Sequence, residues 1–171
     1  LDAHRGGNLL DPGEDLVEGA VRLASVRLPP GVKVSVQVER HVLVRANRRK
    51  LSQVVLNLLV NAGEALEEAR TPGGRVVVHG EVASDGYTLH VDDTGPGLPE
   101  AVLHRLFEPF FTTKGPGKGT GLGLALSREY LAGFNASIRA GNRPGGGARF
   151  SLHLRLAQVT GETPLPGRLV A

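Results

Sequence analysis

The sequence predicts an α+β fold: a two-layer α/β sandwich with a mixed, mostly antiparallel sheet and helices on one face. Two kinds of hydrophobic periodicity alternate along the chain, one of two residues for strands and one of 3.6 residues for helices. In two places one strand-like segment follows another across a short glycine-containing turn, as in antiparallel hairpins. The length of 171 residues, with 40% hydrophobic and 22% charged residues, favours one globular domain.

The composition also excludes several classes of function. The chain has no cysteine, so it can form neither disulfides nor thiolate metal sites. A net charge of +3 without a long basic run, and an aromatic content of 4%, argue against nucleic acid as a partner. The sequence contains no run of 18 apolar residues, so no membrane span is expected within it. Residues 1–10 are expected to be a linker or the end of a preceding element, residues 11–157 the domain, and residues 158–171 a loosely held tail.

The first half of the chain predicts two helices and two strands. Asp11 as N-cap and Pro12 at the first helical position begin a helix that the "PPG" at 29–31 ends. Alternating valines over 32–38 predict a half-buried strand, and "VLV" at 42–44 predicts a short second one.

A long helix over about 48–69 follows, capped by Asn47 and stopped by "TPGG". The remaining elements are a hairpin of 75–83 with 87–93, a short helix over 99–106, a mobile loop over 107–119, a helix over 120–132, and paired strands at 136–140 and 148–156.

Polar side chains interrupt the apolar pattern of the long helix. At 100° per residue, one narrow stripe holds Lys50, Gln53, Asn57, Asn61, Glu64 and Glu68. The stripe is either the solvated face of an amphipathic helix or the wall of a site. Asparagine is a poor helix former, whereas two amide oxygens at i, i+4 suit a hard cation such as Mg²⁺.

Two glycine-rich segments are ambiguous in the same way. "VDDTGPG" is either a turn with solvated aspartates or a carboxylate that accepts a hydrogen bond from a ligand lying against the glycines. "GKGTGLGLALS" is either a linker or a phosphate cradle that leads into a helix N-terminus. It does not have the P-loop order. The six histidines show no metal-binding spacing, which favours ordinary surface or strand positions.

Taken together and in order, these motifs resemble the catalytic, ATP-binding domain of sensor histidine kinases, within the ATPase group that includes the 90 kDa heat-shock chaperone, gyrase and MutL. The matching segments are the N box "QVVLNLLVNAGEAL", the G1 box "VDDTGPGLP", the F box "LFEPFFTTK", the G2 box "GTGLGLALS" and the last glycine box "GGGARF". They span residues 53–150. The resemblance implies the Bergerat ATP-binding fold and a nitrogen-regulation-like subtype.

The resemblance also implies roles for particular residues. Asn61 is expected to ligate Mg²⁺, and Asn57 to contact the metal shell or phosphate, so both are expected to be catalytic. Asp93 is expected to accept the adenine amino group. The residues expected at the ATP are Asn57, Asn61, Glu64, Asp93, Gly95, Gly97, Leu98, Phe107, Lys114, Lys118, Gly119, Thr120, Gly121, Leu122, Gly123 and Leu124. The 107–119 loop, with Phe107, Phe110 and Phe111, is expected to be a lid.

Three departures from the family pattern stand out. Glu64 replaces a common lysine or arginine, so Lys114 or Lys118 is expected to supply the missing cation. Ala148 replaces a common threonine, and "LAGFNASIRA" lacks the usual glycine pair, where a loop change is expected.

The family's acceptor histidine, with its "HE-x-x-NP"-like context, does not occur here, and His4 lies in a different context. We therefore expect a fragment of a homodimeric kinase, with this domain monomeric and cytoplasmic and with membrane anchoring of the full-length protein left open. Its expected partners are a dimerisation segment carrying the phosphoacceptor histidine and a response regulator receiver domain. The alternatives are a nucleotide-binding regulatory module of anti-sigma type and a conformational ATPase. The F box "LFEPFFTTK", a histidine-kinase feature, disfavours the conformational ATPase, and so does Asn57, because those ATPases usually have a glutamate at that position.

Overall fold

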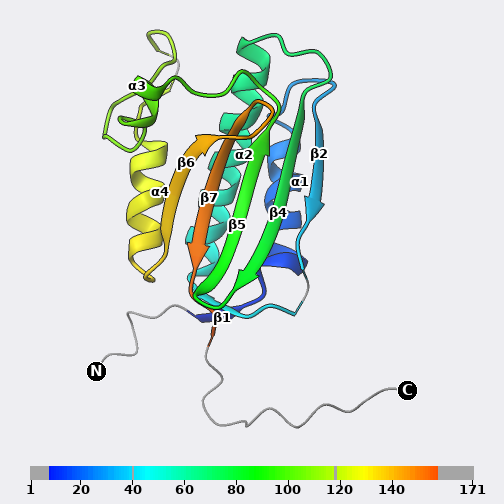
Figure 1. Ribbon diagram of the computed structural model, residues 1–171, viewed down its shortest axis with the longest axis vertical. Coiled ribbons are helices and arrows are strands. Elements are labelled where there is room, and N and C mark those ends of the chain that lie inside the picture. The colour runs from blue at the N-terminus through cyan, green and yellow to red at the C-terminus, as the bar shows by residue number, and fades with distance from the viewer. Residues whose placement is uncertain (1–7, 40, 118, 158–171) are drawn as a thin grey trace.

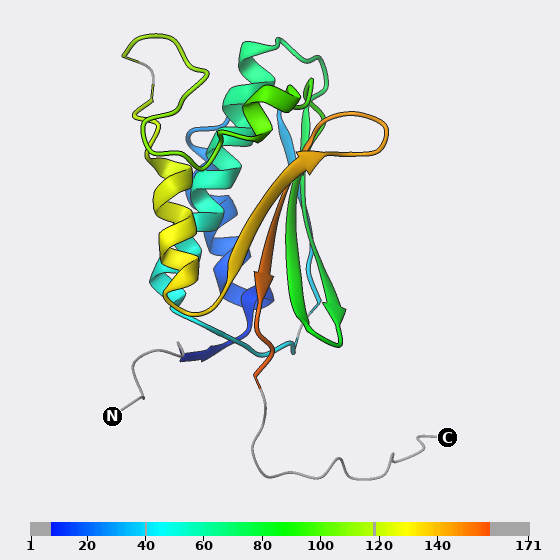
Figure 2. The same cartoon turned by 60° about the vertical axis from the view of Figure 1, so that its left-hand side comes forward.

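The computed structural model describes residues 8–39, 41–117 and 119–157, which form a five-stranded sheet with helices packed on one face (Figure 1). Figure 2 shows the two layers edge-on, with the helices on one side of the sheet. The elements in chain order are β1 (Asn8–Leu10), η1 (Pro12–Val17), α1 (Glu18–Ser25), β2 (Lys33–Gln37), β3 (Val44–Ala46), α2 (Arg48–Glu68), β4 (Arg75–Ala83), β5 (Gly86–Asp93), α3 (Glu100–Leu103), α4 (Gly123–Ala132), β6 (Ser137–Asn142) and β7 (Ala148–Leu154).

The sheet has the strand order β2-β4-β5-β7-β6. The pair β2–β4 is parallel, and the other three pairs are antiparallel. Both hairpins expected from the sequence, β4–β5 and β6–β7, are present. The predicted α+β sandwich, with its mixed sheet and its helices on one face, is therefore confirmed.

The long helix α2 forms as predicted and spans 21 residues. The side-chain oxygen of Asn47 accepts a hydrogen bond from the Lys50 N–H at 3.0 Å, which satisfies one of the free donors of the first turn. Leu58 and Leu59 are almost fully buried beneath the sheet. Each buried leucine side chain contributes about 1.5–3 kcal/mol through removal of apolar surface from water.

The N-terminal region differs from the prediction. Asn8–Leu10, expected in a linker, pair antiparallel with β3, which occupies residues 44–46 rather than 42–44. A strand of three residues is too short to show a periodicity in the sequence. Leu10 is buried, so packing against the core holds this strand in place. The first helix begins with a π-helical stretch over Pro12–Val17 before α1. The tail at 158–171 lies outside the described residues.

The helices near the lid are shorter than predicted. The expected helix over 99–106 is α3, a single turn that gives way to turns after Leu103. The helix expected from residue 120 begins at Gly123, because Gly119 and Gly121 have φ values of +96° and +69°, outside the helical region. After α4, Asn135 takes a φ of +58°, the conformation that asparagine tolerates best after glycine, in place of the missing glycine pair.

None of the helices in the described part of the chain combines the length and the apolarity that crossing a membrane requires.

Candidate functional site

A cavity of about 1140 Å³ lies between the polar face of α2, the end of β5, the loop that follows α3 and the start of α4. The loop lies beside the N-terminal end of α4 in both views (Figures 1 and 2). Of the residues predicted at the site, those that line the cavity are Asn57, Asn61, Glu64, Asp93, Gly97, Leu98, Lys114, Gly119, Thr120, Gly121, Gly123 and Leu124. Gly95, Phe107 and Leu122 are not among the lining residues, and Lys118 lies outside the described residues.

The polar stripe of α2 forms one wall of the cavity rather than a face in bulk water. Asn57 lies against the start of α4, where its Nδ2 donates to Ser127 Oγ at 3.4 Å. Ser127 donates in turn to the Gly123 carbonyl at 2.8 Å. A side chain at Gly123 would come within 2.8 Å of the Asn57 oxygen, so glycine is what allows the two helices to approach. Ser127 was not among the residues predicted from the sequence, because it lies 70 residues from Asn57.

The two aspartates at the end of β5 have different environments. Asp93 faces the cavity, is 4% exposed, and accepts hydrogen bonds at Oδ1 from the N–H groups of Gly95 (2.8 Å) and Ala148 (3.3 Å). Burial raises the pKa of the Asp93 carboxyl against the opposing effect of these two donors. None of the hydrogen bonds in the described structure uses Oδ2. Asp93 therefore offers a desolvated acceptor to a ligand that carries a donor.

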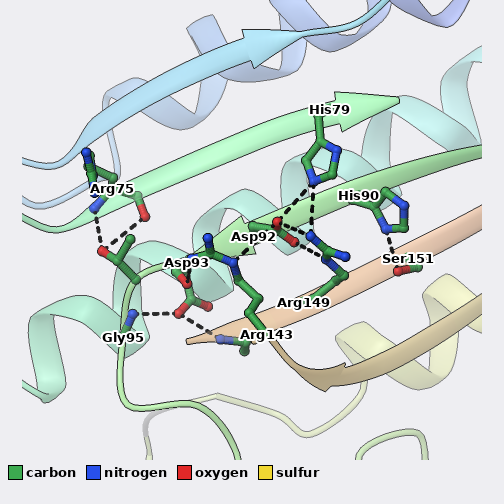
Figure 3. Close-up of polar contacts among 11 residues, drawn as sticks. Arg75, His79, His90, Asp92, Asp93, Gly95, Arg143, Arg149 and Ser151 are labelled. Carbon is green, nitrogen blue, oxygen red and sulfur yellow. Dashed lines mark hydrogen bonds and ion pairs between the residues drawn. The ribbon is translucent and has the colours of Figure 1, made fainter. Parts of the chain in front are cut away.

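Asp92 lies on the opposite face of the sheet, at the centre of an ion-pair network (Figure 3). Its two oxygens accept from Nε and Nη2 of Arg149 at 2.8 Å each, and His79 Nε2 lies 3.0 Å away. Burial alone would raise the pKa of Asp92, but the bonds to Arg149 and His79 outweigh it, and the pKa lies below its ordinary value. Arg143 approaches Asp92 at 3.4 Å and donates to the Asp93 carbonyl at 3.0 Å, so the network also holds the backbone of Asp93.

A side chain of β6 fixes the loop after Asp93. Asn142 accepts a hydrogen bond from the Leu98 N–H at 2.7 Å and donates to the Leu98 carbonyl at 2.8 Å. Gly97 has a φ of +78°, and a side chain there would meet the Asn142 oxygen at 2.6 Å. The role of Gly95 is similar, since it donates to Asp93 and leaves room for that carboxylate. Asn142 has no signal in the sequence, because its partner is 44 residues away.

The loop before α4 is held at its base. The Phe110 N–H donates to the Gly121 carbonyl at 2.9 Å, and a side chain at Gly121 would overlap the Phe110 backbone. Phe107 packs against the core, with the Arg128 guanidinium 5.7 Å from its ring, whereas Phe111 lines the cavity. Phe107 is therefore an anchor of this loop and not a wall of the cavity.

The start of α4 and one lysine supply positive potential to the cavity. The N-cap position of α4, Leu122, makes no side-chain cap hydrogen bond, so the first N–H groups remain available to an anion. Lys114 donates through Nζ to the Glu64 carboxylate across the cavity. The residue that departs from the family pattern is thus paired with the lysine expected to compensate for it.

Comparison with known proteins agrees with this geometry. Residues 46–158 match the family described as histidine kinase-, DNA gyrase B-, and HSP90-like ATPase. The chain is 43% identical over 121 residues to the two-component sensor PprA of Pseudomonas aeruginosa, covering 69% of this chain and 13% of that protein. It is 35% identical over 150 residues to the C4-dicarboxylate transport sensor protein DctS of Rhodobacter capsulatus, covering 87% of this chain and 22% of that protein. The chain thus spans less than a quarter of either curated relative.

Solved structures show the same fold. The mycobacterial sensor histidine kinase MprB superimposes with a TM-score of 0.75 at 25% identity, over 88% of this chain and 100% of that one. Full-length ShkA in complex with AMPPNP gives 0.72 at 28% identity, over 95% of this chain and 34% of that one. The relatives are C4-dicarboxylate and other sensors, which does not support the nitrogen-regulation-like subtype. The chain belongs to the histidine kinase-, DNA gyrase B- and HSP90-like ATPase family, as a catalytic domain of the two-component sensor histidine kinase type.

Proposed function

We propose that the chain binds Mg·ATP in the cavity and transfers the γ-phosphoryl group to a histidine on a separate dimerisation segment. The observation that carries the proposal is the convergence on one cavity of a buried carboxylate, two helical asparagines and a free helix N-terminus. These groups match the two ends of a nucleotide. The base needs a specific acceptor, and the phosphates need donors and positive potential.

At the base end, the free Oδ2 of Asp93 accepts a hydrogen bond from the adenine amino group. A neutral amide or hydroxyl would make a weaker bond, because hydrogen bonds to an ionised acceptor are roughly twice as strong. Gly97 and the loop pinned by Asn142 let the purine lie close to the backbone. This end supplies recognition and takes no part in the transfer.

At the phosphate end, the first N–H groups of α4 and Lys114 face the triphosphate. The donor set of α2 fits Mg²⁺, since amide oxygens of Asn57 and Asn61 are the hard ligands that this ion prefers, with Asn61 as the direct ligand. Held there by Asn57 and Asn61, Mg²⁺ would neutralise charge on the transferring phosphoryl group. The chain's own donors orient the γ-phosphorus for in-line attack by an imidazole nitrogen.

The partners follow from this reaction. The acceptor is the phosphoacceptor histidine of a dimerisation segment, and the phosphoryl group then passes to a response regulator receiver domain. Because ATP is the donor, the reaction takes place in the cytoplasm. The full-length kinase acts as a homodimer.

The proposal is tested by mixing this chain with γ-labelled ATP, Mg²⁺ and a dimerisation segment of the same kinase. We expect label on the segment only in the mixture, and the bond should be acid-labile and base-stable, as for phosphohistidine. Asn61→Ala should lower the initial rate of labelling about tenfold or more, because a metal ligand is lost. Acid-stable label would indicate a serine acceptor and an anti-sigma-like activity. Rapid ATP hydrolysis without label would indicate a conformational ATPase.

The Glu64–Lys114 pair gives a second prediction. Lys114 can hold either Glu64 or a phosphate, so Lys114→Gln should weaken ATP binding about three- to tenfold, whereas Glu64→Gln should leave it unchanged or tighten it. The pair is partly exposed, and such pairs contribute at most about 1 kcal/mol, so neither change should unfold the protein. Calorimetric titration with ATP and ADP measures both affinities. Equal weakening by the two substitutions would show that the intact pair, rather than free Lys114, serves the nucleotide.

A further inference from the structure

Two histidines and a glutamate meet on the face of the sheet that is turned away from the cavity. His79 on β4 and His90 on β5 are directly paired in register, with ring centroids 4.7 Å apart. Glu81 lies two residues beyond His79 and so projects from the same face of β4. One ligand atom from each of the three side chains lies within 4.8 Å of the other two. Strand register within the β4–β5 hairpin thus brings together three side chains of types that bind metal ions.

Each imidazole is also oriented by a hydrogen-bond partner: in each ring, one nitrogen lies within hydrogen-bonding distance of a side-chain oxygen. Nε2 of His79 lies 3.0 Å from the Asp92 carboxylate, and among the described residues no hydrogen bond uses the other ring nitrogen, Nδ1 (Figure 3). Nδ1 of His90 lies 2.7 Å from the Ser151 hydroxyl, and its Nε2 faces the Glu81 carboxylate at 3.6 Å. Metal-binding histidines in proteins almost always carry such a partner, which fixes the tautomer and the ring orientation.

The spacing is close to that of a bound ion. Two ligands on a tetrahedral ion at about 2.0–2.1 Å lie about 3.3 Å apart, near the 3.6 Å between His90 and Glu81. The Glu81 side chain is 69% exposed and can rotate inward without disturbing the core. The charge of Asp92 is balanced by Arg149, so Glu81 supplies the negative charge at the ion.

We propose that His79, Glu81 and His90 form a second metal site, for a first-row divalent transition ion such as Zn²⁺, on the outer face of the sheet. Imidazole with one carboxylate is a donor set for Zn²⁺ and its neighbours and not for Mg²⁺, which prefers oxygen. Three protein ligands leave the fourth position to water. An ion bound there would cross-link β4 to β5. Through His79 it would also contact the ion-pair network of Asp92, which holds the backbone of Asp93 through Arg143. This inference is independent of the proposed kinase activity.

The test is a Zn²⁺ titration of the untagged protein without nucleotide, read by competition with a chromophoric chelator. We expect one equivalent bound, undisturbed by excess Mg²⁺, and a four-coordinate visible spectrum with Co²⁺. Glu81→Gln and His90→Ala should each lower the Zn²⁺ affinity tenfold or more. Because Glu81 is exposed, its substitution keeps the fold, and ATP binding by Glu81→Gln should equal that of the wild type.

Two other histidines serve as matched controls. His104 is an exposed histidine 3.8 Å from Glu100, and His153 lies on the same face of the sheet, where it meets Thr88 at 3.3 Å. His104→Ala and His153→Ala should leave Zn²⁺ binding unchanged. The site is ruled out if wild-type protein binds Zn²⁺ no tighter than Glu81→Gln, or if either control loses as much affinity as His90→Ala.

Discussion

Asp93→Asn is expected to weaken ATP binding several hundred-fold while the domain stays folded. The asparagine oxygen still accepts from the Gly95 and Ala148 N–H groups, so the local structure is kept. Its NH₂ group, however, replaces the free Oδ2 and turns a donor toward the adenine amino group. The loss of a hydrogen bond to a charged acceptor and the resulting unpaired donors together cost about 3–4 kcal/mol.

Calorimetry measures the affinity, and urea denaturation measures the free energy of unfolding. The wild type should also bind ATP less tightly as the pH falls, because protonation removes the acceptor. Since burial raises the pKa of Asp93, this loss begins at a higher pH than for an exposed aspartate. Asp93→Asn should lack that pH dependence. Wild-type affinity in the variant would exclude Asp93 as the adenine acceptor.

Gly147→Ala is expected to lower the free energy of unfolding by about 3–5 kcal/mol, a loss of the size reserved for strain or severe overpacking. Gly147 has a φ of +92°, and a side chain there would overlap the carbonyl oxygen of Asp93. The added Cβ atom and the Asp93 carbonyl both belong to or adjoin the backbone and cannot rotate away, so the strands β5 and β7 must move apart. ATP affinity should fall as well, because Asp93 moves with its backbone.

Gly145→Ala is the matched control in the same turn. Its φ is +87°, but a side chain there meets nothing within 4 Å. Only the backbone conformation is strained, which costs about 1–2 kcal/mol. Urea unfolding of the two variants separates conformational strain from the close approach. If the two lose equal stability, contact with Asp93 has no part in the requirement for glycine at 147.

The sequence by itself determined the elements whose causes are local. Asn47 caps α2 because its side chain bonds an N–H three residues away. The β4–β5 hairpin follows from period-two patterns on either side of a short turn. The polar stripe holding Asn57 and Asn61, and the aspartate followed by glycines, were found because they stand within a few residues of one another. The resemblance to the family then joined these segments into one site.

Only the tertiary structure decided how distant residues pair. The Glu64–Lys114 contact joins residues 50 apart, and Asn142 holds a loop 44 residues away. The six histidines showed no metal-binding spacing, and although the sequence predicted the β4–β5 hairpin, it did not give the register that sets His79 directly opposite His90. Hydrogen bonding within a helix or turn acts over three or four residues and leaves a trace in the sequence. Pairing across a sheet or a cavity depends on where the chain returns, which no local pattern records.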